Sequence, residues 1–352
     1  MYNKKRKHYI IIRFDTEVIH MNMETLDMEY SILDDGTIEI TKYNGKGGNV
    51  VIPSSIEGKK VTSIGEDAFG GCDSFTNITI PNSITSIGDY AFYECIQLAS
   101  ITIPYSVNYI GYCAFEFCTN LIRINVETGN EKYSSENGIL YNHDKTKLIC
   151  YPAGKKETSF SIPDSVTSIC TFAFKGCESL TSVTIPSSVT NLGDNVFEHC
   201  INLSSIIIPD GVTSIGGGTF AYCTSLTSIT IPNSVTNICD YAFFICKSLT
   251  TITIPNSVTE IGRCAFYNCS NLASITIQDS VISIGKEAFF KCNSLSSIII
   301  PGSVASIYKY ALGYGRICNN NYEKIPDFKI YCYQGTVGEK YAKFHGFDYE
   351  LI

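Results

Sequence analysis

The sequence predicts a repeat solenoid, a stack of similar coils whose strands form one parallel sheet. Three observations predict it. Prolines and cysteines recur at a step of 23 residues, an alternating apolar run precedes most of these prolines, and 44% of the 352 residues are apolar, which suits a folded chain. A coil of this length buries its apolar edge only against another coil, so the coils must stack. We expect about ten to twelve such turns.

Two residue types set the phase of the repeat. Prolines stand 23 residues apart, with Gln278 in the one slot where proline is missing, at Pro163, Pro186, Pro209, Pro232, Pro255 and Pro301. Nine of the sixteen cysteines share a second phase, at Cys72, Cys95, Cys118, Cys177, Cys200, Cys223, Cys246, Cys269 and Cys292. Agreement over nine units is a specific signal for a repeat fold.

The first half of each unit predicts a strand. In a representative unit, Ile229 and Ile231 alternate with Ser228 and Thr230. Successive side chains of a strand point to opposite faces, so the isoleucines face the core and the hydroxyl residues face outward. Pro232 lacks an N–H group and therefore ends the ladder.

The second half of the unit returns the chain to the next strand. Val235 and Ile238 turn back inward at a wider spacing. Ala242, Phe243 and Cys246 then follow at spacings of one, three and four residues, which predicts a short helical or 3₁₀ return. We expect Phe243 and its equivalents to fill the core between coils.

The unit pattern L-x-x-I-x-I-P-x-S-V-x-x-I-G-x-x-A-F-x-x-C resembles the BspA-type (Treponema-pallidum-type) leucine-rich repeat over about residues 50–315. The resemblance implies an α/β leucine-rich-repeat fold, a curved right-handed solenoid with its parallel sheet on the concave face. It also implies a protein exposed on a cell surface that binds host or matrix proteins, as members of that family often do.

One long interruption breaks the period. Cys118 and Cys177 are 59 residues apart, and the extra segment at about 127–158 holds two apolar runs around a polar turn. This pattern predicts a β-hairpin inserted in the solenoid, which we assign to residues 63–315. Hairpin inserts of this kind recur in the resembled family.

Both ends need caps, because an open coil exposes apolar edge and unpaired strand. Residues 29–62 hold an expected capping hairpin, with its turn at residues 34–36, and the first strand. Residues 316–352 form the expected C-terminal cap, where residues 336–339 predict a capping box and Gly346 a helix stop. The helical face expected to cover the last coil consists of Val337, Tyr341, Phe344 and His345.

The first 28 residues give little support for export. Residues 1–28 have a basic start and an apolar run that ends at Arg13. A secretory signal needs a run of about 7–15 residues and a small-residue cleavage site, and neither is present. We interpret the segment as a disordered tail or as sequence upstream of a later start. Secretion or surface exposure thus depends on the family resemblance, and a cytoplasmic location stays open.

Charge and hydropathy exclude two classes of protein. The net charge is −8, whereas a nucleic-acid-binding protein carries a basic face. No apolar run approaches the roughly 18 residues of a membrane helix. We therefore expect neither a nucleic-acid partner nor a membrane span.

The cysteines and histidines do not indicate a catalytic or metal site. No C-x-x-C occurs, and a 23-residue step matches no common zinc-ligand spacing. We interpret the cysteines as buried, reduced thiols that pack like small hydrophobic residues. No histidine stands four residues from another, and none completes a triad. The sequence thus predicts no catalytic residue, no cofactor and no metal.

The outward strand positions form a nearly uncharged grid of hydroxyl residues. The small polar side chains have three interpretations: they solvate a curved sheet, they form a floor that recognises sugars or peptides, or they match the lattice of ice or mineral. Interruptions by Ile207 and Ile299, together with curvature, argue against the lattice. The expected concave-face residues are Arg123, Ser182, Thr184, Ser205, Ser228, Thr230, Thr251, Thr253, Ser274 and Thr276.

Aromatic residues gather in slots of the repeat outside the core columns. One group is Tyr90, Tyr93, Tyr112 and Phe117, and the other is Tyr241, Phe244, Tyr267 and Phe290. Large rigid rings in variable slots favour contact with a partner, and packing at the sheet edge is the alternative. The Tyr241 group in particular is expected to be the exposed binding surface.

These observations together predict a non-enzymatic binding protein. The favoured function is adhesion or protein recognition at a cell surface, with a host or matrix protein as partner. An intracellular interaction scaffold is one alternative. Binding of a glycan, or of ice or mineral, by the hydroxyl grid is a more remote one.

Overall fold

The computed structural model describes residues 27–318 and 321–352. Its contacts divide the chain into two compact units, Met1–Ser134 and Ser135–Ile352. The division falls within strand β11 (Tyr133–Glu136), inside the predicted insert. Each unit is a stack of short coils, and each is described below by itself.

The first unit begins with the predicted capping hairpin. Strand β1 (Met28–Ile32) pairs antiparallel with β2 (Ile38–Tyr43). Gly36 supplies the left-handed turn residue, at φ +82°. Strand β2 then pairs in parallel with β5 (Lys59–Ile64), so the hairpin covers the first coil and starts the stack. The sequence prediction of an N-terminal hairpin cap is confirmed.

Two parallel ladders, and not one sheet, join the coils of the first unit. The long-strand ladder uses the L-x-x-I-x-I segments and consists of β3 (Gly48–Val51), β6 (Phe75–Thr79), β8 (Ser100–Ile103) and β10 (Arg123–Val126). The short-strand ladder uses the S-V-x-x-I segments and consists of β5, β7 (Ser86–Ile87) and β9 (Tyr109–Ile110), with β4 (Ser55–Ile56) pairing antiparallel with β5. The prediction of a single sheet was incomplete, because the short strands form a second one. Two extended residues in each coil are enough to pair with the equivalent two residues of the next coil.

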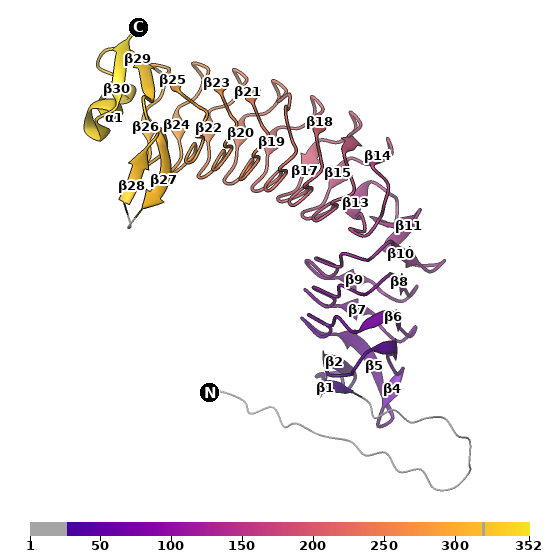
Figure 1. The fold of residues 1–352 in the computed structure, drawn as a ribbon. Helices are drawn as coiled ribbons and strands as arrows, with labels where there is room; N and C mark the ends of the chain where they lie inside the picture. The colour runs from indigo at the N-terminus through magenta and orange to yellow at the C-terminus, as the bar shows by residue number, and fades with distance from the viewer. Residues whose placement is uncertain (1–26, 319–320) are drawn as a thin grey trace, which may run out of the picture. The chain divides into compact units, whose positions relative to one another are not determined.

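The second unit repeats both ladders, which lie on different sides of its coils (Figure 1). The long-strand ladder contains β14 (Ser159–Ser161), β16 (Ser182–Thr184), β18 (Ser205–Ile207), β21 (Thr251–Thr253), β23 (Ser274–Thr276) and β25 (Ser297–Ile300). The short-strand ladder contains β13 (Lys147–Cys150), β15 (Ser168–Ile169), β17 (Asn191–Leu192), β19 (Ser214–Ile215), β20 (Asn237–Ile238), β22 (Glu260–Ile261), β24 (Ser283–Ile284) and β26 (Ser306–Ile307). Partners in consecutive regular coils differ by 23 residues, as in Ser182 with Ser205.

The predicted insert contributes to the stack. Strand β12 (Ile139–Asn142) pairs antiparallel with β13, as expected for a hairpin. Strand β13 also pairs in parallel with β15, through Leu148 and Ile169, so the second arm of the hairpin forms a rung of the short-strand ladder. With this rung and the caps, the described part of the chain has about 13 turns. The expected ten to twelve turns counted only units that carry the consensus pattern.

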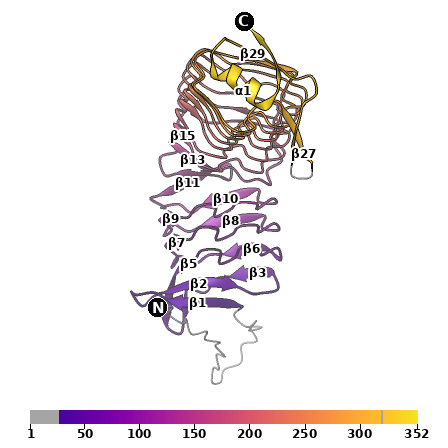
Figure 2. The same ribbon diagram turned by 90° about the vertical axis from the view of Figure 1, so that its left-hand side faces the viewer.

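The last coil is covered by a hairpin, two strands and a helix. Strands β27 (Tyr314–Cys318) and β28 (Asn321–Lys324) pair antiparallel, while β29 (Lys329–Cys332) and β30 (Asp348–Leu351) extend the long-strand ladder beyond β25. Helix α1 (Val337–His345) lies across the end of the stack and packs against β26 and β29 (Figure 2). The short helical cap predicted from the sequence is confirmed.

The details of the helix differ from the prediction in two respects. Thr336 makes no side-chain cap bond to the helix, and its hydroxyl donates to the Tyr333 carbonyl at 2.7 Å, while Glu339 accepts the N–H of Gly335. The predicted reciprocal capping box is therefore wrong. Phe344 is 86% exposed, so it does not lie over the last coil, whereas Tyr341 does. Gly346 ends the helix in the left-handed conformation, as expected.

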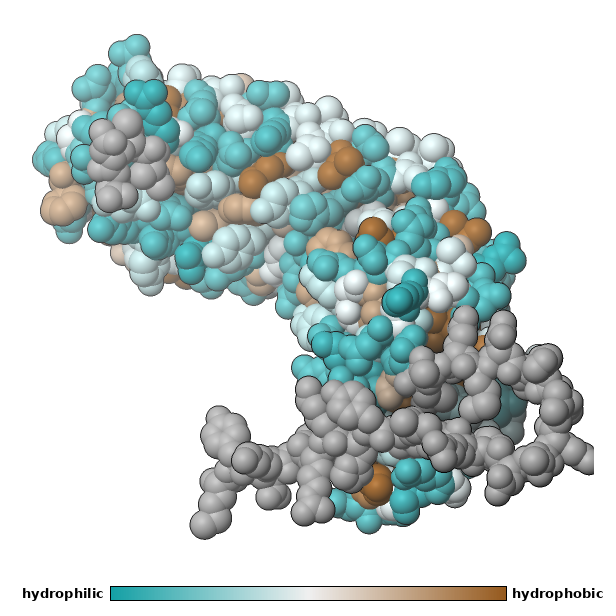
Figure 3. Space-filling view, turned by 60° about the horizontal axis from the view of Figure 1, so that its bottom comes forward, coloured by the Kyte–Doolittle hydropathy of each residue, from teal (hydrophilic) through white to brown (hydrophobic). Residues whose placement is uncertain are grey.

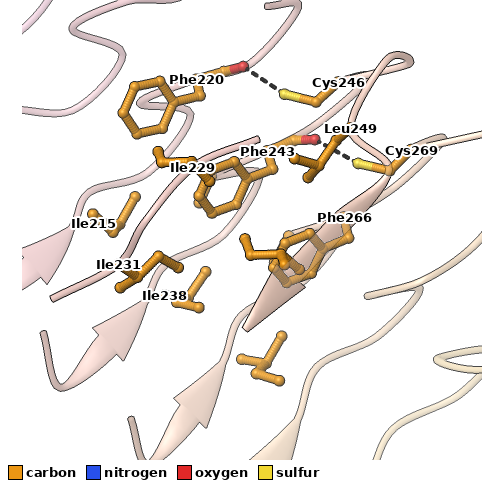
Figure 4. Packing of buried hydrophobic residues seen from close by; sticks show 14 of the residues in the cluster. Ile215, Phe220, Ile229, Ile231, Ile238, Phe243, Cys246, Leu249, Phe266 and Cys269 are labelled. Carbon is orange, nitrogen blue, oxygen red and sulfur yellow. Dashed lines mark hydrogen bonds between the residues drawn. The ribbon is translucent and has the colours of Figure 1, made fainter. Parts of the chain in front are cut away.

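Stacked phenylalanines run through the centre of the second unit. Phe220, Phe243 and Phe266 are fully buried, and their rings stack at centroid distances of 5.4 and 5.1 Å (Figure 4). Isoleucines from both ladders, such as Ile229 and Ile238, pack beside them. The inward assignment of Phe243 and of the strand isoleucines is confirmed, because burial of one column in every coil is what holds consecutive coils together.

The return segment is a turn and not a helix. Tyr241 and Ile245 both have left-handed backbone angles, φ +59° and +61°, and they flank Phe243. This alternation points successive N–H groups in different directions: Phe243 donates to Ala265 in the next coil, while Phe244 donates to Tyr241 in its own coil. The predicted helical or 3₁₀ return is wrong, because intercoil bonds take every second N–H group and leave only alternate bonds within the turn.

The repeat cysteines do more than fill space. The Cys246 thiol donates to the Phe220 carbonyl, and the Cys269 thiol to the Phe243 carbonyl, each at 3.1 Å (Figure 4). The same bond to the preceding coil occurs, at 3.0–3.1 Å, for Cys95, Cys118, Cys200, Cys223 and Cys292. Burial raises the pKa of Cys200 to about 12, so the thiol keeps its proton. The cysteine column is therefore a hydrogen-bonded element of the coil.

Candidate recognition surface

The residues of the expected hydroxyl grid lie on the outward side of the long strands. That this side is the concave face stays a prediction. Ser228, Thr230, Thr251 and Thr253 are exposed. So are Arg123, Thr184, Ser205, Ser274 and Thr276, while Ser182 is half-buried. Ile207, which is 76% exposed, interrupts the grid. Apart from Arg123 and Ile207, the grid positions named here all hold Ser or Thr, so they distinguish one coil little from the next.

Many hydroxyls beside the grid have a structural task that the sequence analysis missed. One position before each grid row, Ser204 donates to the Thr181 carbonyl at 3.1 Å, and Thr227 to the Ser204 carbonyl at 3.3 Å. On the other side of the coil, Ser234 donates to the Val212 carbonyl at 2.6 Å. These bonds join neighbouring coils, so the abundance of Ser and Thr is partly a feature of stacking. Their period of 23 residues was the available signal.

In the second unit, five rings form a continuous set on the side of the return turns. We call His199, Tyr222, Tyr241, Phe244 and Tyr267 the turn-face aromatic row; all five are half-buried. His199 stacks on Tyr222 at 4.2 Å, and Phe244 stacks on Tyr267 at 4.9 Å. Phe244 also meets Tyr222 and Tyr241 edge-on at 5.4 and 5.5 Å. Mutual packing thus holds these rings in place before any partner arrives.

Phe290 does not belong to this surface. The repeat pattern predicted that Phe290 is exposed with Tyr241, Phe244 and Tyr267, but its side chain is fully buried. One face stacks on Tyr267 at 5.2 Å, and Tyr322 of β28 covers it at 5.3 Å. The capping hairpin, which lies more than thirty residues further along the chain, buries this ring.

The first unit has an aromatic cluster of its own. Tyr90 meets Tyr93 and Tyr112 edge-on at 5.8 and 6.0 Å, and Tyr93 meets Phe117 at 5.6 Å. Tyr112 is 49% exposed and the others are half-buried. The structure therefore brings together the four rings that the sequence grouped.

Cations lie over the rings of the turn-face aromatic row. The Arg263 guanidinium is 5.7 Å from the centroid of Tyr241, and the Lys291 ammonium is 5.8 Å from that of Tyr267. Such contacts stabilise a cation at the rim of the row. Figure 3 shows that hydrophobic residues on the face it displays occur in small separate patches among hydrophilic and neutral ones. Because Arg263 and Lys291 lie at its edge, the row is a polar-rimmed aromatic surface.

Residues 27–318 and 321–352 contain no group of three or more His, Cys, Asp or Glu side chains placed to hold a metal ion. Over the same residues, no helix is long and apolar enough to span a membrane, and α1 has only nine residues.

Parallel ladders, a stacked core column and a 23-residue period together define a leucine-rich-repeat solenoid. The family profile of the BspA type leucine rich repeat region matches residues 48–149, 147–273 and 213–338. The chain therefore belongs to the BspA-type leucine-rich-repeat family, as the resemblance indicated.

Solved structures agree with this assignment. A leucine-rich repeat protein from Eubacterium ventriosum is 26% identical, with a TM-score of 0.61 over 84% of this chain and 97% of that one. A leucine rich cell surface protein from Faecalibacterium prausnitzii is also 26% identical, with a TM-score of 0.54 over 74% of this chain and 95% of that one. A comparison with curated proteins found no match.

Proposed function

We propose that this chain is a non-enzymatic recognition protein that binds another protein through the turn-face aromatic row. One observation carries the proposal: the row consists of half-buried rings in slots that the coil does not need for closure. Tyr241 occupies a slot that holds Asn195 two coils earlier, and Tyr222 occupies one that holds Asn268 two coils later. The rings are therefore additions to the repeat and not requirements of it.

The physical properties of the row suit a binding surface. Aromatic side chains bury roughly 150–250 Å² each, and Tyr is among the commonest anchors of protein interfaces. Because Phe244 and Tyr267 already stack on each other, little side-chain entropy remains to be lost on binding. The aromatic cluster of the first unit, around Tyr90 and Tyr112, offers a second surface of the same kind.

We propose that recognition takes place at a cell surface, with a host or matrix protein as partner. The similar protein from Faecalibacterium prausnitzii is described as a cell surface protein, which supports this location. A specific observation favours the alternative of an intracellular scaffold: fifteen of the sixteen cysteines are seen as free thiols, as is usual in reducing compartments.

The test compares two double variants on a protein and glycan array. Tyr222→Asn with Tyr241→Asn should retain the fold, because Asn suits the left-handed backbone of both positions. We expect it to weaken binding to any protein that the parent captures at least tenfold, or about 1.4 kcal/mol. Ser228→Ala with Thr230→Ala is the matched control on the hydroxyl grid. Loss of binding in the control alone would reject the proposal and assign recognition to the grid.

A further inference from the structure

The second unit has a groove at its C-terminal cap that lies apart from the turn-face aromatic row. It has a volume of about 950 Å³ and lies between the end of β26 and helix α1. This volume is at the upper end of the range for ligand-binding pockets, and the groove is open to solvent. The expectation that α1 simply seals the last coil therefore omits a cavity.

The floor of the groove is rigid and aromatic. Tyr341 is buried, and its hydroxyl bonds to both the N–H and the carbonyl of Leu312, each at 3.2 Å. Tyr314 is also buried, and its hydroxyl lies 2.8 Å from Nδ1 of His345. Tyr310 is held by a stack with Tyr322 at 3.6 Å. The hydroxyl groups of Tyr341 and Tyr314 thus have hydrogen-bond partners within the protein. The floor therefore offers its rings to an apolar group of a ligand.

The rim of the groove is cationic. Lys309 and Lys340 are exposed, and neither makes an ion pair with a carboxylate of the described residues. No Asp or Glu lines the groove, although acidic residues outnumber basic ones in the chain as a whole. Phe344, which is 86% exposed, adds a large apolar side chain beside the lysines. The Lys309 ammonium lies 4.8 Å from the centroid of the Tyr310 ring, so it has an aromatic neighbour but no carboxylate partner. An exposed ring next to cations without a carboxylate partner favours a ligand that carries both carboxylates and an apolar side chain.

We propose that this groove binds an acidic segment of a partner protein, with an aromatic or aliphatic side chain on the tyrosine floor and flanking carboxylates on Lys309 and Lys340. The charge complementarity of the rim is the argument for this occupant: a ring-lined groove without lysines would accept any apolar segment, whereas this one rejects basic segments. The proposal does not depend on the turn-face aromatic row, since it uses none of the row's residues.

The test uses fluorescein-labelled peptides and the full chain, with anisotropy as the readout. The probes are EEFEE, its charge-reversed counterpart KKFKK, and EEGEE, which lacks the ring. We expect EEFEE to bind, EEGEE to bind at least fivefold more weakly, and KKFKK not to bind. Raising the salt concentration from about 50 to about 500 mM should weaken EEFEE binding, because the pairs with the lysines are exposed.

Variants locate the site. Lys309→Glu with Lys340→Glu should weaken EEFEE binding at least tenfold, and Phe344→Ala at least threefold. Lys132→Glu with Lys247→Glu is the matched control, since both lysines are exposed, neither lines the groove, and the pair gives the same change in net charge. Thermal melts of all variants should match the parent, because the exchanged side chains are exposed.

Three outcomes would overturn the proposal. One is equal loss of EEFEE binding in the groove variant and in its control, since the effect would then be net charge. Another is binding of KKFKK as tightly as EEFEE. The third is displacement of EEFEE by a glucuronic-acid oligosaccharide at lower concentration than by unlabelled EEFEE, which would reassign the groove to a sugar acid. Tyr222→Asn with Tyr241→Asn should leave EEFEE binding unchanged, so failure here is distinguishable from failure of the proposed function.

Discussion

The thiol of Cys246 donates a hydrogen bond of 3.1 Å to the carbonyl oxygen of Phe220, one coil earlier. The same carbonyl also accepts the backbone N–H of Cys223, at 3.1 Å. One oxygen therefore fixes a turn within its own coil and ties that coil to the next. This dual use explains why cysteine, and not alanine, recurs at this slot: only the thiol combines a small apolar volume with a donor.

Substitutions at Cys246 should separate bonding from packing. Cys246→Ala removes the donor and leaves a small cavity, which should cost about 1–2 kcal/mol of unfolding free energy. Cys246→Ser keeps a donor, so we expect it to be about 1 kcal/mol more stable than the alanine variant. Denaturant unfolding measures both. A serine variant no more stable than the alanine variant would show that the slot requires apolar volume alone.

Stability should decline in mildly alkaline solution. The folded-state pKa of Cys200 is raised by burial from its usual 9.0 to about 12, and Cys177, Cys223, Cys246 and Cys292 are shifted in the same direction. Below pH 9 both states hold their protons, so the thiols add no pH dependence. Above pH 9 the unfolded chain ionises first, and each thiol then lowers the unfolding free energy by about 1.4 kcal/mol per pH unit.

Urea midpoints between pH 7.5 and pH 10.5 would measure this slope. Cys200→Ala should make it shallower by the contribution of one thiol. A slope unchanged by that substitution would assign the alkaline loss to other groups, such as the tyrosines.

The ladder thiols should be reduced and unreactive in the folded protein. Native alkylation at pH 8 should label none of Cys177, Cys200, Cys223, Cys246, Cys269 and Cys292, because all six are buried. Alkylation after denaturation without reductant should label all six, as read by mass spectrometry. Finding most of them bridged would instead place the protein in an oxidising compartment.

Buried and half-buried aromatic residues of the repeat should differ in how much their truncation costs. Phe243→Ala and Phe290→Ala each empty a fully buried site and should cost about 3–5 kcal/mol. Tyr241→Asn should change the unfolding free energy by less than about 1 kcal/mol, since the side chain is half-buried and the left-handed backbone suits Asn. A parent-like midpoint for Phe290→Ala would contradict its burial beneath Tyr322.

Ile245 should be a destabilising residue in the native sequence. It has a left-handed backbone, φ +61°, which is unfavourable for a β-branched side chain, and the same slot holds Asn268 in the next coil. Ile245→Asn should therefore raise the unfolding free energy by about 1 kcal/mol. Asn268→Ile is the reverse control and should lower it by a similar amount. Identical melting of both variants and the parent would show that the strain is negligible.

Much of the fold follows from local rules that the sequence displays directly. The alternation of Ile229 and Ile231 with Ser228 and Thr230 is a strand period, and Phe243 recurs in step with it. The second ladder was missed because two extended residues, such as Asn237 and Ile238, leave no period to detect. The turn was mistaken for a helix because a spacing of three and four residues is shared by both structures.

The hydrophobic period of 23 residues determined by itself that this chain stacks coils, which residues face the core, and that the ends require caps. Tertiary structure alone decided which aromatic rings remain accessible. Phe290 and Tyr267 occupy the same slot of successive coils, yet Phe290 is buried because Tyr322 reaches back from the cap, and Phe344 is exposed because its helix turns another face to β26. The 23-residue period shows what all coils have in common. The exposure of one side chain depends on which other part of the chain packs against its own coil.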